Sequence, residues 1–174
     1  MQEAAAPKDK NGSASKGKSN TAVGGASTPP AAATVSATDK ANEFKDNGNA
    51  LFKKGEYLAS IQMYTAAIAL APRNPVYYSN RAMSYLKLEM YEQTISDCDS
   101  SIAVTWSAKA ALRRGTARAA MGLWTEALDD FDAVVRSEPH NRAAVEQAEE
   151  CRTMLATSVY ADDVKMPVQV EGLL

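Results

Sequence analysis

The sequence predicts an all-α fold in which seven helices pack mainly as antiparallel pairs. Three observations support this prediction. The central part of the chain consists of three similar units in tandem, each unit holds two segments with helical spacing of apolar residues, and Asn, Gly and Pro separate the segments. A single helix pair cannot bury its own apolar face, so a stack of three pairs closed by a final helix is the expected arrangement.

Equivalent positions in the three units carry similar residues. A shift of 34 places Tyr57 on Tyr91, and a further shift of 33 places Tyr91 on Trp124. A position of small residues follows the same register, with Gly48, Ala82 and Gly115. This agreement in register indicates that the three units share one structure.

The boundaries of the predicted helices follow from capping and helix-breaking residues. In the first unit, one helical segment ends at Gly55 and a second stops at Pro72. Asn74 and Pro75 supply an N-cap and a first-turn proline for the next helix, and Asn141 can cap the last one. The predicted parts are an arm at 1–38, repeats at about 41–74, 75–107 and 108–141, a capping helix at 141–157 and a tail at 158–174, with the repeat domain covering 39–157.

Residues 1–38 are expected to form a disordered arm. They contain no aromatic residue, Leu, Ile or Cys, so they cannot bury enough apolar surface to offset the entropy lost on folding. Within the arm, residues 12–19, GSASKGKS, fit the phosphate-loop pattern G-x-x-x-x-G-K-[ST]. No strand-like run precedes this segment, and Gly24, Gly25 and Pro29 oppose a helix after it. We therefore predict no nucleotide site and no cofactor.

Charge and cysteine content argue against several function classes. The formal net charge is −2, and because residues 1–38 hold four lysines and two acids, the remainder has a charge of −4. Such an acidic domain is a poor candidate for nucleic-acid binding. Cys98 and Cys151 lack metal-type spacing and the single histidine is His140, so two reduced, packed thiols are expected rather than a metal site. No apolar run resembles a signal sequence or a membrane span, so we expect no membrane partner and a cytoplasmic location, with the nucleus as an alternative.

The three units resemble the tetratricopeptide repeat, a helix pair with small residues at fixed offsets and a closing proline. The first unit reads FKDNGNAL…SIQMY…P and the third reads RGTAR…ALDDF…P. The middle unit reads YSNRAMSY…TISDC…W, with Thr94 in place of the usual Ala and Trp106 in place of the usual Pro. The resemblance implies a right-handed α-solenoid of three helix pairs plus a C-terminal capping helix, with the first helix of each pair lining a concave surface.

Periodicity and the resemblance together place five cations and only one acid, Asp46, on the concave surface. The cations are Lys45, Lys53, Lys87, Lys109 and Arg113. The acids concentrate on the second helices, at Asp97, Asp99, Glu126, Asp129, Asp130 and Asp132. A cationic groove in an acidic domain would attract and orient an acidic peptide.

Five of the inward residues resemble the carboxylate clamp of tetratricopeptide co-chaperones. They are Lys45, Asn49, Asn80, Lys109 and Arg113, which fit the patterns K-x-x-x-N, YYSNRA and K-x-x-x-R. The resemblance implies that they hold the two adjacent carboxylates of a C-terminal Asp. The implied partner is the acidic Glu-Glu-Val-Asp tail of heat-shock protein 90, heat-shock protein 70 or both. The residues expected to form a secondary groove beside the clamp are Phe52, Lys53, Met83, Lys87 and Thr116.

The leading hypothesis is therefore a monomeric adaptor or co-chaperone that is not an enzyme. The alternative is a repeat scaffold that binds another partner through its groove or its C-terminal tail, with the clamp unused. Residues 164–170 alternate between apolar and other residues as a strand does. Residues 158–174 are therefore expected to be either a flexible, disordered tail or a segment that binds a client adaptor by adding a strand to its sheet. Ala111 and Leu112 stand where the family often has aromatic residues, which leaves the preference between the two chaperones open.

Overall fold

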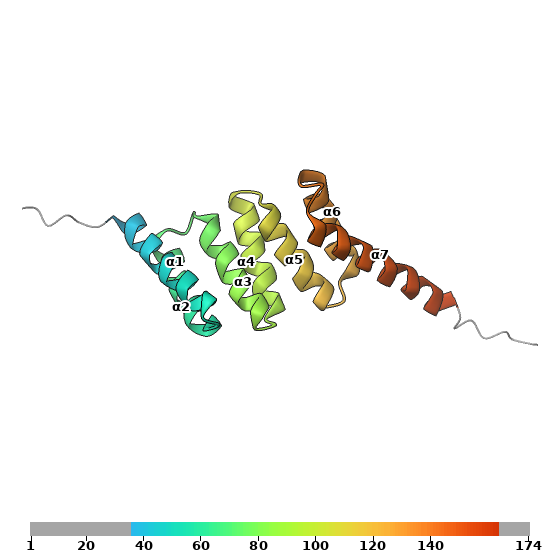
Figure 1. The fold of residues 1–174 in the computed structure, drawn as a ribbon, viewed down its shortest axis with the longest axis horizontal. Helices are drawn as coiled ribbons and strands as arrows, with labels where there is room; N and C mark the ends of the chain where they lie inside the picture. Colours follow the sequence, from blue (N-terminus) through green and yellow to red (C-terminus); the bar gives the residue numbers. More distant parts are fainter. Residues whose placement is uncertain (1–35, 164–174) are drawn as a thin grey trace, which may run out of the picture. The chain divides into compact units, whose positions relative to one another are not determined.

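The computed structural model describes residues 36–163, with side chains to residue 157, and this part of the chain is all-helical (Figure 1). The chain divides into the units Met1–Thr34 and Val35–Leu174, and all described residues belong to the second. The helices are α1 (Ala37–Lys53), α2 (Tyr57–Leu70), α3 (Pro75–Lys87), α4 (Tyr91–Val104), α5 (Ala108–Ala120), α6 (Trp124–Ser137) and α7 (Arg142–Asp163). The prediction of an all-α stack with seven helices is confirmed for this part of the chain.

The helices form two rows, and the odd-numbered row is the inner one. Each helix packs against the next in sequence, so the chain alternates between the rows (Figure 1). Within the described residues, neighbouring odd-numbered helices also contact one another, whereas neighbouring even-numbered helices do not. The stack therefore curves toward the odd-numbered helices, which places α1, α3 and α5 on its concave side.

Small residues allow the two helices of each pair to approach closely. A Cβ added to Gly48 on α1 would lie 2.7 Å from the ring of Tyr64 on α2, and one added to Gly115 on α5 would lie 2.7 Å from the ring of Phe131 on α6. In the middle pair the equivalent positions in the repeat register hold Ala82 and the smaller Cys98, and both are fully buried. Each pair thus matches a small residue with a partner of complementary size.

The turns within the pairs use a left-handed backbone residue at one shared position. Gly55 has a φ of 82° and Gly122 a φ of 78°, and the equivalent residue of the middle pair is Glu89, with a φ of 58°. Glycine adopts this conformation without steric cost, whereas glutamate does not. The middle turn is therefore the strained member of the three.

The predicted helix caps are present. Asn74 Oδ1 accepts a hydrogen bond from the backbone N–H of Val76 at 3.1 Å, and Asn141 Oδ1 accepts one from Ala144 at 3.2 Å. Two helix ends differ from the boundaries expected from the sequence. The N-cap of α1 is Ser36, inside the segment predicted as an arm, and α7 continues to Asp163 rather than ending at residue 157. Residues 1–35, which include residues 12–19, and residues 164–174 lie outside the described residues.

Arginines on the inner helices pair with aspartates on the outer helices. Arg81 makes a bidentate ion pair with Asp97, with both N–O distances at 2.7 Å. Arg114 pairs with Asp130 at 2.6 Å and also with Asp99. The pairs Arg81–Asp97 and Arg114–Asp130 have the same separation along the chain, so they are one feature repeated in consecutive units.

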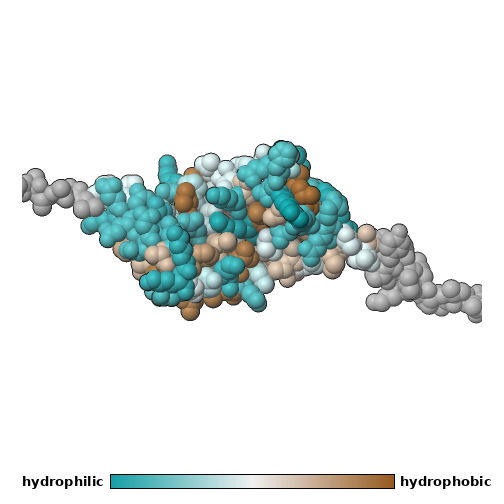
Figure 2. Space-filling model, viewed as in Figure 1, coloured by the Kyte–Doolittle hydropathy of each residue, from teal (hydrophilic) through white to brown (hydrophobic). Residues whose placement is uncertain are grey.

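The exposed hydrophobic residues belong to several helices and turns. On the face that Figure 2 shows, brown areas alternate with teal ones. Among the described residues, no helix combines the length and the apolar character that crossing a membrane requires.

Candidate functional site

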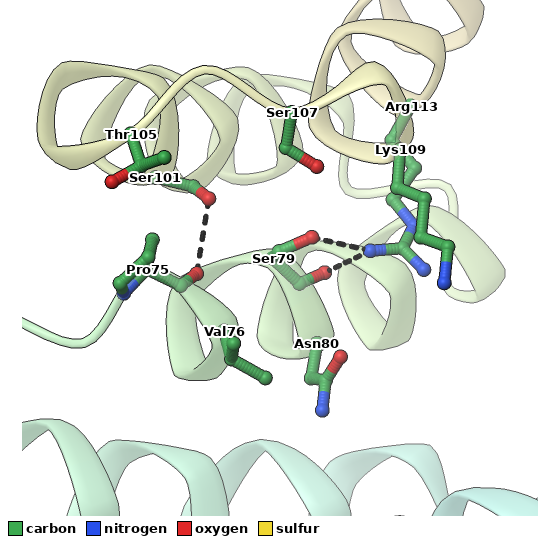
Figure 3. Close-up of a pocket in the computed structure, with 9 residues that line it drawn as sticks. All are labelled: Pro75, Val76, Ser79, Asn80, Ser101, Thr105, Ser107, Lys109 and Arg113. Carbon is green, nitrogen blue, oxygen red and sulfur yellow. Dashed lines mark hydrogen bonds between the residues drawn. The ribbon is translucent and has the colours of Figure 1, made fainter.

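A pocket of about 240 Å³ opens between α3, the end of α4 and the start of α5 (Figure 3). It is lined by Pro75, Val76, Ser79, Asn80, Ser101, Thr105, Ser107, Lys109 and Arg113. Three of the five predicted clamp residues, Asn80, Lys109 and Arg113, therefore share one pocket. The other two, Lys45 and Asn49, belong to α1 and do not line it.

Arg113 is a partly buried cation that lacks an acidic partner among the described residues. Its Nη1 donates hydrogen bonds to the backbone oxygen of Ser79 at 2.7 Å and to the Ser79 hydroxyl at 2.5 Å (Figure 3). No carboxylate of the described residues lies within ion-pair distance of its guanidinium. Burial accordingly lowers the pKa of Arg113, because desolvation disfavours the charged form.

The adjacent residue, Arg114, shows the opposite arrangement. Its ion pairs with Asp130 and Asp99 raise its pKa, and the hydrogen bonds to Asp130 make the largest contribution. Successive residues of a helix point in directions about 100° apart. Arg114 therefore serves the packing of α5 against the outer helices, whereas Arg113 is directed into the pocket and is available to an external anion.

Asn49 and Asn80 are joined by a direct hydrogen bond across α1 and α3. The amide of Asn80 donates to Asn49 Oδ1 at 3.1 Å, and the hydroxyl of Tyr64 donates to the same oxygen at 2.8 Å. Through this contact Asn49 lies at the border of the pocket. The structure thus brings four of the five predicted clamp residues into one neighbourhood.

Lys45 is the predicted clamp residue that, among the described residues, neither lines the pocket nor hydrogen-bonds to a residue that does. Its Nζ lies 3.1 Å from Asp46 Oδ1, and the Asp46 side chain is 68% exposed. An exposed ion pair of this kind contributes little free energy. A ligand carboxylate can therefore replace Asp46 as the partner of Lys45 at little cost.

None of the predicted secondary-groove residues lines the pocket that holds Asn80, Lys109 and Arg113. Phe52 packs against Tyr57, with ring centroids 5.3 Å apart, whereas Lys53 and Lys87 are exposed and Met83 is partly buried. Thr116 lines a different pocket, of about 210 Å³, between α5, α6 and α7. Its hydroxyl lies 3.0 Å from Gln147 Oε1 on α7.

Sequence reasoning missed the side chains that hydrogen-bond to the predicted clamp residues from neighbouring helices. The contacts of Tyr64 with Asn49 and of Ser79 with Arg113 join residues on different helices, and periodicity alone gives only the face of each helix. The arginine–aspartate pairs could have been predicted from the sequence, because Arg and Asp recur at the same separation in two consecutive units. In the described part of the chain, no group of acidic residues, His and Cys has the arrangement of a metal site, and Cys98 and Cys151 are buried thiols.

Comparison with known proteins finds related repeat domains. Residues 48–89 match the family described as TPR repeat. The first TPR domain of Spaghetti (RPAP3), solved with the HSP90 peptide SRMEEVD, is 36% identical, with a TM-score of 0.68 over 68% of this chain and 95% of that chain. The second TPR domain of human RPAP3, solved with the HSP70 peptide SGPTIEEVD, is 40% identical, with a TM-score of 0.63 over 65% of this chain and 95% of that chain.

A curated relative is much longer than the matching region. Human serine/threonine-protein phosphatase 5 is 32% identical over 125 residues, which is 71% of this chain and 25% of that protein. This chain thus spans about a quarter of the relative's length. The similarity concerns the repeat domain and not the rest of the phosphatase.

Proposed function

Because the chain belongs to the tetratricopeptide repeat family, whose fold mediates protein interactions, we propose that it is an adaptor for chaperones. In this proposal its concave side captures the acidic C-terminal Glu-Glu-Val-Asp tail of heat-shock protein 90, heat-shock protein 70 or both. Two similar domains were solved with peptides ending in this sequence, one from HSP90 and one from HSP70. Their similarity to this chain supports the class of ligand.

The observation that carries the proposal is that Arg113 is partly buried and has no acidic partner among the described residues. Burial of a cation without an acidic partner is unfavourable, so a ligand carboxylate that supplies the partner gains more here than at an exposed site. Lys109 and Asn80 line the same pocket and provide a second positive charge and an amide. A C-terminal Asp has two carboxylates close together, which suits this set of donors.

The mechanism has two stages. The unpaired cations of the groove attract the acidic tail over a distance, which raises the rate of encounter and weakens with added salt. Charge-assisted hydrogen bonds then hold the terminal carboxylates in the pocket. The guanidinium of Arg113 is suited to this second stage, because Ser79 engages Nη1 and no partner in the described residues engages its other nitrogens.

Calorimetric titration of the full chain with Met-Glu-Glu-Val-Asp, with a free or an amidated C-terminus, tests the proposal. The free peptide is expected to bind and the amidated one to bind much more weakly, because amidation removes one of the two carboxylates. Arg113→Ala should weaken binding about 10- to 150-fold, since a hydrogen bond to a charged group contributes roughly 1.5–3 kcal/mol. Arg136→Ala is the matched control, because it removes an equal charge from an exposed position on α6, outside the pocket.

Two outcomes would contradict the proposal. Equal binding of the free and the amidated peptide would show that the terminal carboxylate is not recognised. Absence of binding to either peptide would favour the alternative of a repeat scaffold with an unused clamp. In that case, binding partners captured by the full chain and by a variant lacking residues 158–174 should be compared, because the tail is then the leading candidate surface.

A further inference from the structure

The hydroxyl of Tyr64 lies directly behind the proposed clamp. Tyr64 belongs to the outer helix α2 and is 2% exposed, so it cannot reach a ligand in the groove. Its Oη nevertheless donates a hydrogen bond to Asn49 Oδ1 at 2.8 Å. It is therefore a core residue with one polar contact to the candidate site.

This contact bears on how Asn49 faces the groove. A carboxamide has an acceptor oxygen at one end and a donor NH₂ group at the other. Tyr64 and Asn80 both donate to the oxygen of Asn49, so the oxygen is held toward them and the NH₂ group is left available. In the opposite orientation the Asn49 oxygen would face an incoming carboxylate, and the two negatively polarised groups would repel each other.

We propose that Tyr64 is a positioning residue that fixes the carboxamide of Asn49 so that its NH₂ group is presented to the acidic ligand. The identity of that ligand rests on the proposed function, whereas the orientation of Asn49 does not. Asn80 alone is a weaker orienting group, because its own carboxamide can rotate with that of Asn49. The hydroxyl of Tyr64 is the part of this hydrogen-bond chain that is anchored in the core.

Two features make Tyr64 a rigid donor. Its ring is pressed against α1 at Gly48, where even a methyl group would lie 2.7 Å from it. Burial raises the pKa of Tyr64 to about 12, so the hydroxyl stays protonated at neutral pH.

The equivalent residues of the other units, Cys98 and Phe131, have no hydroxyl. The hydroxyl is thus specific to the unit that carries Asn49.

Tyr64→Phe is a minimal test, because Phe is the natural residue at this position in the third unit. The full-chain variant is expected to bind the free Met-Glu-Glu-Val-Asp peptide roughly 3- to 10-fold more weakly, in the range of one hydrogen bond. In an Asn49→Ala background the same change should have little effect, because Tyr64 acts through Asn49. An equal loss in both backgrounds would overturn the inference.

Tyr77→Phe is the matched control. Tyr77 is fully buried, and its hydroxyl donates to Asn42 Oδ1 on the same inner helix, α1, at 3.0 Å. The two variants therefore lose the same kind of hydrogen bond, but only the hydroxyl of Tyr64 hydrogen-bonds to a predicted clamp residue. Peptide affinity should change less than twofold in Tyr77→Phe, and an equal loss in both variants would point to a general structural effect instead.

A second measurement is independent of any peptide. The side-chain NH₂ resonances of Asn49, assigned by their absence from Asn49→Ala, report the orientation of the carboxamide in the free full chain. They should shift and lose their defined contacts to neighbouring protons in Tyr64→Phe but not in Tyr77→Phe. Unchanged resonances would overturn the inference. If the wild-type chain binds no acidic peptide, the proposed function fails, and these resonances still decide whether Tyr64 positions Asn49.

Discussion

Gly48→Ala tests the size matching that sets the spacing of the helix pairs. The added methyl group would lie 2.7 to 3.0 Å from three ring atoms of Tyr64, closer than carbon atoms approach without displacement. Overpacking of this kind costs about 1–3 kcal/mol. Alanine is favoured over glycine inside a helix by roughly 0.5–1 kcal/mol, which offsets part of that cost. A net loss of about 0–2.5 kcal/mol in the free energy of unfolding is therefore expected.

The middle pair suggests a decisive partner mutation, because it combines Ala82 with Cys98 in the same register. In a Tyr64→Cys background the ring is absent, so Gly48→Ala should become stabilising by roughly 0.5–1 kcal/mol. Urea unfolding followed by circular dichroism measures the four proteins of this cycle. A loss of the same size in both backgrounds would refute the size-matching argument, since the cost would then not come from the ring.

Three further predictions concern single residues. Glu89→Gly should stabilise the domain by about 0.5–1 kcal/mol in urea unfolding, because glycine relieves the left-handed strain that glutamate carries, and a lower midpoint would contradict this. Arg114→Ala should lower the free energy of unfolding by about 2–4 kcal/mol, since it removes a partner of the buried Asp130, and an unchanged midpoint would show that the pair is unimportant. Burial raises the pKa of Cys98 from 9.0 to about 12, so native Cys98 should resist alkylation at pH 8 and react only after unfolding. This shift also favours folding below pH 9, and that contribution should be lost as the pH rises from 9 toward 12.

The helical part of the fold was predictable because its signals are local and repeated three times. Asn74 with Pro75, and Asn141, mark helix starts by satisfying N–H groups that any helix leaves unpaired, so they act independently of the rest of the structure. The end of α7 was not predictable in this way. Residues 158–163 contain no Gly or Pro, so nothing in them requires the helix to stop at residue 157.

The site was predictable only as a set of helix faces. Periodicity, together with the resemblance to the repeat family, places Asn49, Asn80 and Arg113 on the inner sides of three helices, and the structure brings these three together. The sequence pattern does not specify which side chains hold these three residues in place. Tyr64 hydrogen-bonds to Asn49 and Ser79 to Arg113, but the pattern assigns Tyr64 only to packing and Ser79 only to the groove in general. Such contacts depend on side-chain length and on the distance between helices, and neither is encoded in residue spacing.

The acidic charge of the domain and its proposed acidic ligand are compatible because much of the acidic charge is engaged elsewhere. Asp97 and Asp130 are buried and face arginines of the inner helices, so their fields are largely neutralised within the pairs. Lys109 and Arg113 have no such partners among the described residues, and their fields extend into the pocket. The net charge therefore does not describe what an approaching ligand meets. The local excess of cations that lack a paired acid decides the sign of the potential in the groove.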